Sequence, residues 1–305
     1  MKKFIFPLIL SLIIGVELYF LDDITLFVTK LLNNHPEIVE IPSNNYKKNT
    51  NYLYVKETND FLPYSYTDLL NIFYTILNSG WTDFTFYCPL EYENCVKDVQ
   101  TICNNDTTLT NINNYVNPLN SFVIVNTSYD DSGEINIKII RLYNDGKIDY
   151  INKEIDSIMN KVLNKSMSDR EKIKALHDYI INNTKYDVER NEKGVSSYES
   201  NTSYGTLKEH MAICSGYADT MAIALNKLGI DNYKIASGTH VWNAVKLDGQ
   251  WYHLDLTWDD PVSNTGEDIL DYKFFLVKNK DLEDLDKNSN DHKFDKSIYL
   301  EFKNN

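Results

Sequence analysis

Cys214 is the cysteine whose sequence context best suits a catalytic nucleophile. It stands near the start of AICSGYADTMAIALNKLGI, residues 212–230, whose apolar spacing predicts a buried helix that ends at Gly229. At a helix N-terminus the free backbone N–H groups and the helix dipole favour a thiolate over a thiol, which suits a nucleophile. A free cysteine is also often a small buried hydrophobe, so this position alone leaves both roles open.

A β-hairpin is predicted downstream of this helix. HVWNAVKLDGQWYHLDLTWDD, residues 240–260, alternates apolar and polar residues on both sides of Asp248-Gly249, which favours a two-residue type I′ turn. Such a turn fixes the register, and the expected facing pairs are Leu247 with Gln250, Val245 with Tyr252, Asn243 with Leu254, and Trp242 with Asp255.

The two faces of this hairpin differ in chemistry. The expected core face holds Val241, Val245, Leu247, Tyr252, Leu254 and Leu256. The other face holds His240, Trp242, Ala244, His253, Asp255 and Thr257. On that face His240 and Asp255 are diagonal neighbours, near enough for an imidazole and a carboxylate to form a hydrogen bond. This pair favours a nucleophilic role for Cys214, because a thiol, a base and an orienting carboxylate are then all present.

The segments ICSGYAD, HVWNAV and WYHLDLTWDDP, in this order and preceded by KIKALHDYI, closely resemble the core of the transglutaminase-like superfamily. The resemblance covers residues 150–300, approximately, and implies an α+β fold: a papain-like transglutaminase core in which a Cys-bearing helix packs on an antiparallel sheet. It implies that Cys214 is the nucleophile, His240 the general base and acid, and Asp255 the group that orients the imidazole.

The chemistry implied is acyl transfer on a peptide or amide bond through a Cys thioester, with neither a metal nor an organic cofactor. Water as the acceptor makes the protein a cysteine peptidase, and an amine makes it a cross-linking enzyme; the sequence leaves both open. Ser215 and Val241 replace the Gln and Ala often seen in the family, and neither change removes a reacting atom. The alternative is a catalytically silent surface binding module, whose usual mark, a missing triad residue, is not found here.

Further residues are candidates for the oxyanion site and the cleft. The backbone N–H of Cys214 is the first candidate donor to the oxyanion. The phenol of Tyr204, in SYGTLKEH, is a second candidate, with packing as its alternative role. Trp242, Trp251 and Trp258 are either cleft walls or ordinary packed aromatics.

Three other histidines lie near these segments. His177 lies beside an apolar helical stripe, where a structural role is favoured over a catalytic one. His253 shares the hairpin face of His240 and is expected to neighbour the site without reacting. His210, four residues before Cys214, could pair with that thiol as a metal ligand, but the role of nucleophile explains Cys214 better.

The elements that must position these residues fall into two predicted units. Residues 52–148 are expected to form a small α+β domain, with strands at YLYVKE and TDFTFYCP, helices at SYTDLLNIFYTILNSG and EYENCVKDVQTICNN, and a hairpin around Asp131-Ser132-Gly133. Residues 150–302 are expected to form the transglutaminase-like catalytic domain. Within it Ser168 and Glu171 have capping-box spacing, which predicts the start of a helix.

The other cysteines cluster in the first unit, at Cys88, Cys95 and Cys103. On one continuous helix Cys95 and Cys103 would be about 12 Å apart, beyond disulfide reach. A bridge between Cys88 and Cys95 is therefore the candidate pairing, with three free thiols as the alternative. A zinc site is less favoured, because no second Cys or His cluster accompanies these three.

Residues 1–21 form an apolar run behind two lysines, interrupted near its end by Glu17. As a helix the run reaches roughly 27 Å, close to the roughly 30 Å of a hydrocarbon core. Basic residues before the run and acidic residues after it place the following chain outside the membrane. The lack of an A-x-A-like cleavage site favours an uncleaved anchor over a removed signal peptide, and a buried helix of a soluble domain is least favoured. Residues 22–51 are then a tether.

Charge and location narrow the partners. The formal net charge of -14 argues against nucleic acid and anionic lipid headgroups, because both would be repelled. The first unit also looks like the extracytoplasmic lead-in of some bacterial members of the family. We therefore expect an extracytoplasmic protein, bound to the membrane through its N-terminal helix, that acts on a protein or peptide substrate, with cell-wall material as one source.

Overall fold

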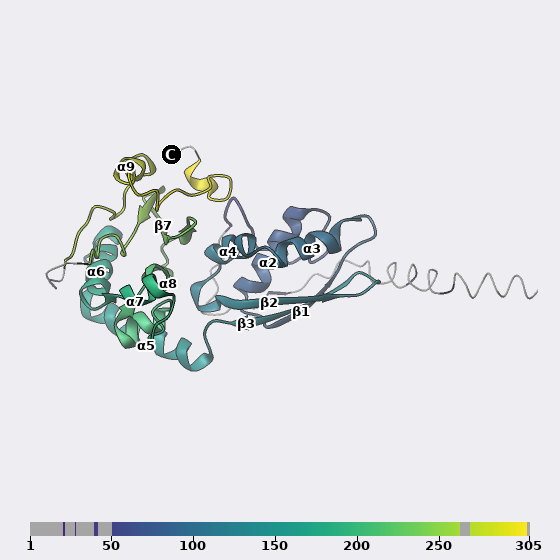
Figure 1. Cartoon of the computed structure of the whole chain (residues 1–305), viewed down its shortest axis with the longest axis horizontal. Helices are drawn as coiled ribbons and strands as arrows, with labels where there is room; N and C mark the ends of the chain where they lie inside the picture. The colour runs from purple at the N-terminus through teal and green to yellow at the C-terminus, as the bar shows by residue number, and fades with distance from the viewer. Residues whose placement is uncertain (1–20, 22–27, 29–39, 42–50, 263–268, 304–305) are drawn as a thin grey trace, which may run out of the picture.

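An antiparallel sheet with helices along it forms the first part of the described chain (Figure 1). The computed structural model describes residues 51–262 and 269–303 together with residues 21, 28, 40 and 41. The sheet has the order β1-β3-β2 and consists of β1 (Asp83–Tyr87), β2 (Phe122–Tyr129) and β3 (Glu134–Arg141). The helices are α2 (Tyr66–Asn78), α3 (Cys95–Cys103) and α4 (Asp106–Tyr115), followed by a 3-10 turn (Pro118–Asn120).

Most of the elements predicted in this part form, and one does not. β1 arises from TDFTFYCP, and β2 pairs with β3 as the predicted hairpin. The strand expected at residues 52–57 is wrong, because this segment has no strand. Tyr52 is instead buried in the core, and the Lys56 N–H donates to Asn71 Oδ1 on α2 at 2.8 Å. The backbone here thus forms a hydrogen bond with a side chain rather than with a neighbouring strand.

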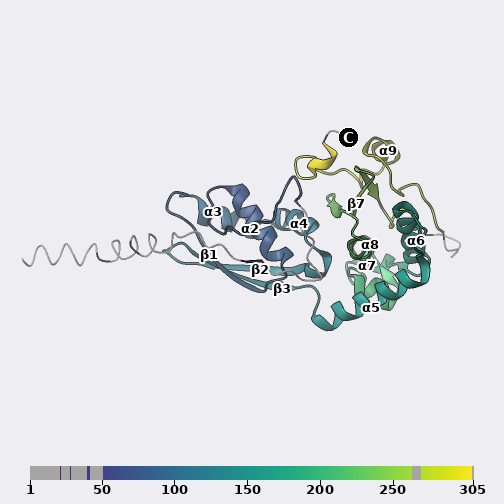
Figure 2. The same cartoon turned by 180° about the vertical axis from the view of Figure 1, so that it is seen from behind.

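The second part places helices on another antiparallel sheet, ordered β6-β7-β8. Its longer elements are α5 (Asp145–Val162), α6 (Asp169–Asn182), α7 (Val188–Lys193), α8 (Cys214–Lys227), β6 (Asn232–Ala236), β7 (Val241–Leu247), β8 (Gln250–Leu254) and α9 (Asn279–Leu285). Its short elements are β4 (Lys185–Tyr186), β5 (Met211–Ala212), a π-helical turn (Gly205–Glu209) and a 3-10 turn (Leu300–Phe302). α8 packs against both β7 and α6, and Figure 2 shows α6 on the far side of α8 from the first sheet.

Local signals fix the ends of the two helices nearest the site. The predicted capping box of Ser168 and Glu171 is confirmed at the start of α6. α8 ends just before Gly229, which has a φ of 71° as expected for a glycine that follows a helix. The Ile230 N–H then donates to the Leu225 carbonyl at 3.0 Å, the wide bond of a Schellman motif. These signals fix the start of α6 and the end of α8.

The β7–β8 hairpin has the predicted register. The pairs Asn243 with Leu254, Val245 with Tyr252, and Leu247 with Gln250 are confirmed. Asp248 and Gly249 have φ values of 52° and 79°, as a type I′ turn requires. This register brings the residues that flank the strands together at the open end of the hairpin.

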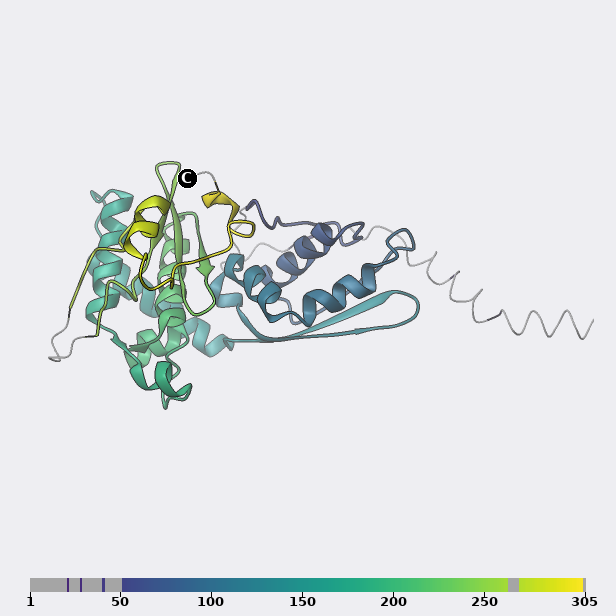
Figure 3. The ribbon, with the colours of Figure 1, turned by 45° about the horizontal axis from the view of Figure 1, so that its top comes forward.

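Both faces of the hairpin are buried, although the sequence indicated one obvious core face. Of the expected core face, all but Val241 pack in the cluster that includes α8. On the other face Trp242 and His253 are also buried, and the rings of Phe294 and Phe302 in the C-terminal segment contact them. Figure 3 shows the C-terminal segment, coloured yellow, running across the hairpin strands. The second face of the hairpin, which carries His240 and Asp255, is therefore largely covered by protein rather than open to solvent.

The fold is mixed α/β with antiparallel sheets, and the buried apolar side chains of the described residues form two hydrophobic clusters. The first cluster joins residues of the β1-β3-β2 part to residues 233–302, and the rings of Tyr52, Tyr115 and Tyr233 contact one another in it. The second surrounds α5, α6 and α8. Since packing continues across residue 150, the limits 52–148 and 150–302 stay a prediction.

The predicted anchor at 1–21, except its last residue, and nearly all of the predicted tether at 22–51 lie outside the described residues. Within the described part of the chain, no helix combines the length and the apolar character needed to cross a bilayer.

Candidate active site

Cys214 is the first residue of α8, and the chain just before it is tightly held. The Ile213 N–H donates to the Ser200 carbonyl at 2.8 Å, and β5 pairs in parallel with β4. Gly216 permits this close approach, since a Cβ there would stand 2.4 Å from the Ser200 oxygen. No side chain caps the first turn of α8, in which the Gly216 N–H donates to the Ile213 carbonyl at 2.9 Å.

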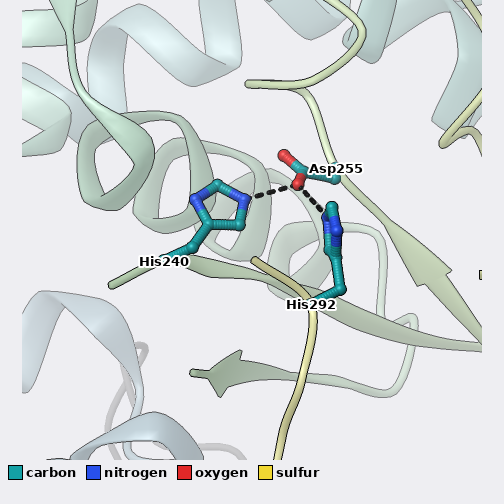
Figure 4. Close-up of side chains that lie close together, drawn as sticks. All are labelled: His240, Asp255 and His292. Carbon is teal, nitrogen blue, oxygen red and sulfur yellow. Dashed lines mark hydrogen bonds and ion pairs between the residues drawn. The ribbon is translucent and has the colours of Figure 1, made fainter. Parts of the chain in front are cut away.

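The structure brings His240 and Asp255 into direct contact (Figure 4). His240 comes just before β7 and Asp255 just after β8, and Nε2 lies 2.5 Å from Oδ2. The two side chains are only 8% and 2% exposed. The Cys214 side chain is close enough to the same imidazole to help raise its pKa, and both residues line one cleft. Thiol, imidazole and carboxylate thus lie next to one another in that order.

The carboxylate of Asp255 accepts hydrogen bonds at both oxygens. Oδ1 accepts from the N–H groups of Thr257 at 2.9 Å and Trp258 at 3.3 Å, and Oδ2 accepts from His240 and from His292 Nε2 at 2.8 Å. Burial would raise the pKa of Asp255, but the charge of His240 and the hydrogen bonds from both histidines outweigh it and hold the pKa well below its usual range. Asp255 is therefore an anion at neutral pH.

His240 is charged for the complementary reason. Burial favours the neutral ring, but the charge of Asp255 and its hydrogen bond, together with the contact to Cys214, raise the pKa of His240 to about 10. The ring is accordingly an imidazolium at neutral pH. An imidazolium next to a sulfur atom favours the thiolate, which is the nucleophilic form of cysteine.

A cleft of about 440 Å³ gives access to this chain of groups. Cys214 and His240 line it, together with Tyr186, Asn191, Thr239, Thr257, Trp258, Asp260, Pro261, Val262 and Asp291. Burial, and then the negative charge at Cys214, raise the pKa of Tyr186 to about 12, so this phenol keeps its proton. The described lining has two aspartates and neither lysine nor arginine, which favours neutral or cationic ligands over acidic ones.

His292 is the residue of this site that the sequence analysis missed. It lies 37 residues after Asp255, outside the segments that carry the family resemblance, and no spacing links it to the hairpin. Its Nδ1 faces Asp286 Oδ1 at 3.2 Å, and Asp286 also accepts a hydrogen bond from Ser289. The only signal available was its residue type, since the chain has six histidines.

Three side chains here could in principle hold a metal ion. His240, Asp255 and His292 place ligand atoms within 4.8 Å of one another, a grouping that the sequence did not predict. Their N to O distances of 2.5 and 2.8 Å are, however, those of direct hydrogen bonds. A metal at this point would have to replace the proton on the His240 nitrogen that binds Asp255. The geometry therefore fits a hydrogen-bonded chain better than a metal centre.

The aromatic candidates lie in different places. Trp258 lines the cleft. Trp242 is buried and stacks on His240 with ring centroids 5.6 Å apart. It therefore packs against a residue of the site and does not line the cleft. Tyr204 is not among the residues that line the cleft in the described structure, and its ring packs on Tyr150 at 5.3 Å. The structure therefore favours packing over an oxyanion role for Tyr204. Trp251 packs on Tyr233.

Two of the other histidines have structural roles. His177 is fully buried, and its two ring nitrogens face Asp178 at 3.0 Å and Asp259 at 3.1 Å, which ties α6 to the segment after Asp255. His253 accepts a hydrogen bond from Trp242 Nε1 at 3.0 Å.

His210 does not pair with Cys214. Its ring nitrogen Nδ1 faces the Asn183 carbonyl at 3.0 Å, and its backbone has a φ of 56° at the end of the π-helical turn. The contact links this turn to the end of α6. The structure therefore gives His210 a role in holding these two segments together, not in a metal site with Cys214.

The structure joins Cys88 and Cys95 by a disulfide, with Cα atoms 5.7 Å apart. The bridge links the end of β1 to the start of α3. Cys103 and Cys214 are free. Burial raises the pKa of Cys103 to about 11, so this thiol is a poor nucleophile at neutral pH.

Comparisons with known proteins find a family model that matches part of the chain, and more distant relatives. Residues 156–256 match the family model of the transglutaminase-like superfamily. The kyphoscoliosis peptidase of Mus musculus is 26% identical over 128 residues, which are 36% of this chain and 19% of that protein. The chain thus spans about a fifth of the length of this curated relative. A solved structure of a TGase is 21% identical and has a TM-score of 0.32, with 45% of this chain and 44% of that chain covered.

Proposed function

We propose, from the transglutaminase-like domain that residues 156–256 form, that the protein is a cysteine enzyme that transfers acyl groups from peptide or amide bonds through a Cys214 thioester. The observation that carries this proposal is the hydrogen bond between His240 and Asp255, with the Cys214 side chain next to the same imidazole on the wall of the cleft. Cys214 is the nucleophile, His240 the general acid and base, and Asp255 the group that orients the ring.

The reaction proceeds in two halves. The Cys214 thiolate attacks the carbonyl carbon of the bound amide, and the His240 imidazolium gives its proton to the leaving amine as the C–N bond breaks. The neutral ring then takes a proton from the acceptor as that acceptor attacks the thioester carbon. The C–S bond breaks, and the thiolate and imidazolium are restored. Water as acceptor gives hydrolysis, and an amine gives transamidation.

The start of α8 supplies the donor for the oxyanion. The tetrahedral intermediate places a negative oxygen near the attacked carbon, next to the sulfur. The backbone N–H of Cys214, in a helix turn that no side chain caps, is the donor we assign to it. Asp260 and Asp291 on the cleft wall favour substrates whose flanking groups are neutral or basic.

The setting of the enzyme is part of the same proposal. A membrane anchor at residues 1–21 and a tether at 22–51 would hold the folded part outside the cytoplasm, with residues 52–148 as a small domain ahead of the catalytic one. The disulfide of Cys88 and Cys95 supports this location, because such bridges persist in oxidising compartments.

The test is to incubate the full-length chain with a protein and cell-wall peptide mixture and a labelled primary amine, and to analyse the products by mass spectrometry. We expect either new peptide termini or incorporated label, and neither product with Cys214→Ala. The matched control is Cys103→Ala, which removes the other free thiol and should leave turnover intact. Products that form equally with Cys214→Ala would contradict the proposal, and a wild-type chain without products would favour a binding module.

A further inference from the structure

Two histidines share one oxygen of Asp255 (Figure 4). His240 Nε2 lies 2.5 Å and His292 Nε2 lies 2.8 Å from Oδ2. The proposed chemistry uses only the first of these imidazoles. The second belongs to a buried pair with Asp286, whose Oδ1 faces His292 Nδ1 at 3.2 Å and whose Oδ2 accepts the His292 backbone N–H at 3.1 Å.

We propose that His292, held by Asp286, is a positioning residue of the site: its doubly protonated ring fixes the Asp255 carboxylate and offsets its charge, so that His240 keeps the orientation and acidity that the reaction needs. The inference rests on the proposed function, since it names a further residue of the same site.

The hydrogen-bond geometry requires a proton on both ring nitrogens of His292. Each nitrogen faces a carboxylate oxygen, and an ionised carboxylate only accepts. Both carboxylates are ionised. Burial opposes ionisation of Asp286, but hydrogen bonds from Ser289 and His292 outweigh it and lower its pKa, as the histidines do for Asp255. A ring with one proton would leave one buried N to O contact without a donor, which is costly.

Packing holds the His292 ring in this orientation. The residue is 4% exposed. Its ring stacks on Phe274 with centroids 4.9 Å apart and an interplanar angle of 15°. The ring centroids of Trp242, which is edge-on, and Trp258, which is tilted, lie 4.9 and 5.4 Å from it. The ring cannot rotate without displacing these aromatics. A carboxylate held by such a ring is itself held in place.

The other charged groups near His292 do not offset the charge of the Asp286 carboxylate, so His292 is the cation that does. The His240 ring lies 5.3 Å away and also faces Asp255. Burial, and then the charge of His292, lower the pKa of His253 to about 3, so that ring is neutral. Lys296 is on the same segment but pairs with Glu283 at 2.8 Å. The two imidazoliums offset the two carboxylates, and loss of His292 adds one uncompensated negative charge beside the Cys214 thiolate.

The test compares His292→Gln, which keeps a neutral donor, with His292→Phe, which keeps an aromatic ring and removes the donor. The readout is alkylation of Cys214 by iodoacetamide across pH, followed by mass spectrometry on the full-length chain. Loss of a nearby cation makes a thiolate harder to form, so both variants should shift the acid midpoint of the profile upward by about 0.5 pH unit or more. Turnover should fall roughly 10- to 100-fold with His292→Phe and less with His292→Gln.

The control is Phe294→Leu, a packing variant of the same segment, which should lower thermal stability without moving the midpoint. An unchanged midpoint in both His292 variants, with stability alone reduced, would overturn the inference. If both variants fail to fold, the wild-type chain decides. In spectra of ¹⁵N-labelled histidine at neutral pH, two protonated nitrogens on His292 support the inference, and one overturns it. An ordinary alkylation profile in the wild-type chain would instead contradict the proposed function itself.

Discussion

Tyr217 donates a hydrogen bond to Asp260, so the helix that begins at Cys214 is bonded directly to the segment that follows Asp255. Both residues are buried. The three proposed catalytic side chains come from the start of a helix, the approach to one strand and the end of another. Their relative position therefore depends on links between these elements, and this hydrogen bond is one such link.

Removal of the Tyr217 hydroxyl should loosen this link. Tyr217→Phe should cost about 2 kcal/mol of unfolding free energy, as expected for a buried hydrogen bond to a charged group. Turnover should fall as well, because the thiol and the carboxylate are then held less firmly. Urea denaturation and a turnover assay measure the two effects. The control is Tyr252→Phe, a half-buried tyrosine of β8 outside the cleft; equal losses in both variants would contradict the role given to Tyr217.

Asp255→Asn should lower the pKa of His240. In the wild-type chain that pKa is raised to about 10 by the charge of Asp255 against the effect of burial. The amide has no charge, whereas burial remains, so the ring should lose its proton at lower pH. NMR of ¹³C-labelled histidine measures both midpoints. A midpoint that stays near its wild-type value would show that Asp255 does not set the charge of the ring.

The raised pKa of His240 also makes stability depend on pH. A group whose folded pKa is above its unfolded value of about 6.5 stabilises the fold fully below that value, and this contribution is lost as the pH rises through about 10. The wild-type chain should therefore have a higher free energy of unfolding than Asp255→Asn at about pH 6.5, and this difference should shrink as the pH rises to about 10. Urea denaturation of both proteins at several pH values tests this, and a constant difference would contradict it.

The disulfide should leave only two reactive thiols. Under denaturing, non-reducing conditions the chain should react with a thiol reagent at Cys103 and Cys214 alone. Replacement of both Cys88 and Cys95 by Ala should cost about 2.5 kcal/mol, the value for a loop of this length. Alkylation of Cys214 should not change, because the bridge lies in the other sheet region. Four reactive thiols in the wild-type chain would show that the bridge is not formed.

A buried ion pair joins α8 to β6. Lys234 Nζ lies 2.5 Å from Asp219 Oδ1, and both side chains are less than a tenth exposed. Lys234→Met should cost about 3 kcal/mol, because Asp219 is left as a buried charge without its cation. The double variant, which combines Lys234→Met with Asp219→Leu, should cost less than the single one, because it leaves no buried charge behind. Urea denaturation compares them, and a larger loss in the double variant would contradict this account.

The parts of the site that depend on local pattern were predictable from the sequence. The Asp248-Gly249 turn sets the hairpin register, and the register alone places His240 near Asp255. The end of α8 at Gly229 and its apolar spacing place Cys214 at the N-terminus. Each of these features follows from residues that are close together in the chain, so periodicity and turn chemistry carry the information.

The parts that depend on distant segments were not predictable in this way. His292 reaches Asp255 because the C-terminal segment folds back over the hairpin, and nothing in the spacing of its residues indicates that path. Residues 52–57 alternate like a strand, yet Tyr52 is drawn into an aromatic cluster with Tyr115 and Tyr233. In both cases tertiary packing decides the outcome, and one sequence without its fold does not reveal it.

The most direct test of the account is the pH dependence of Cys214 alkylation in the full-length chain, with His240→Ala as the comparison. We predict that the wild-type chain reacts at about pH 6 nearly as fast as at about pH 8, because an imidazolium already stabilises the thiolate, and that His240→Ala reacts as an ordinary thiol with a midpoint of about 8.5. A wild-type profile that coincides with that of His240→Ala would contradict the account.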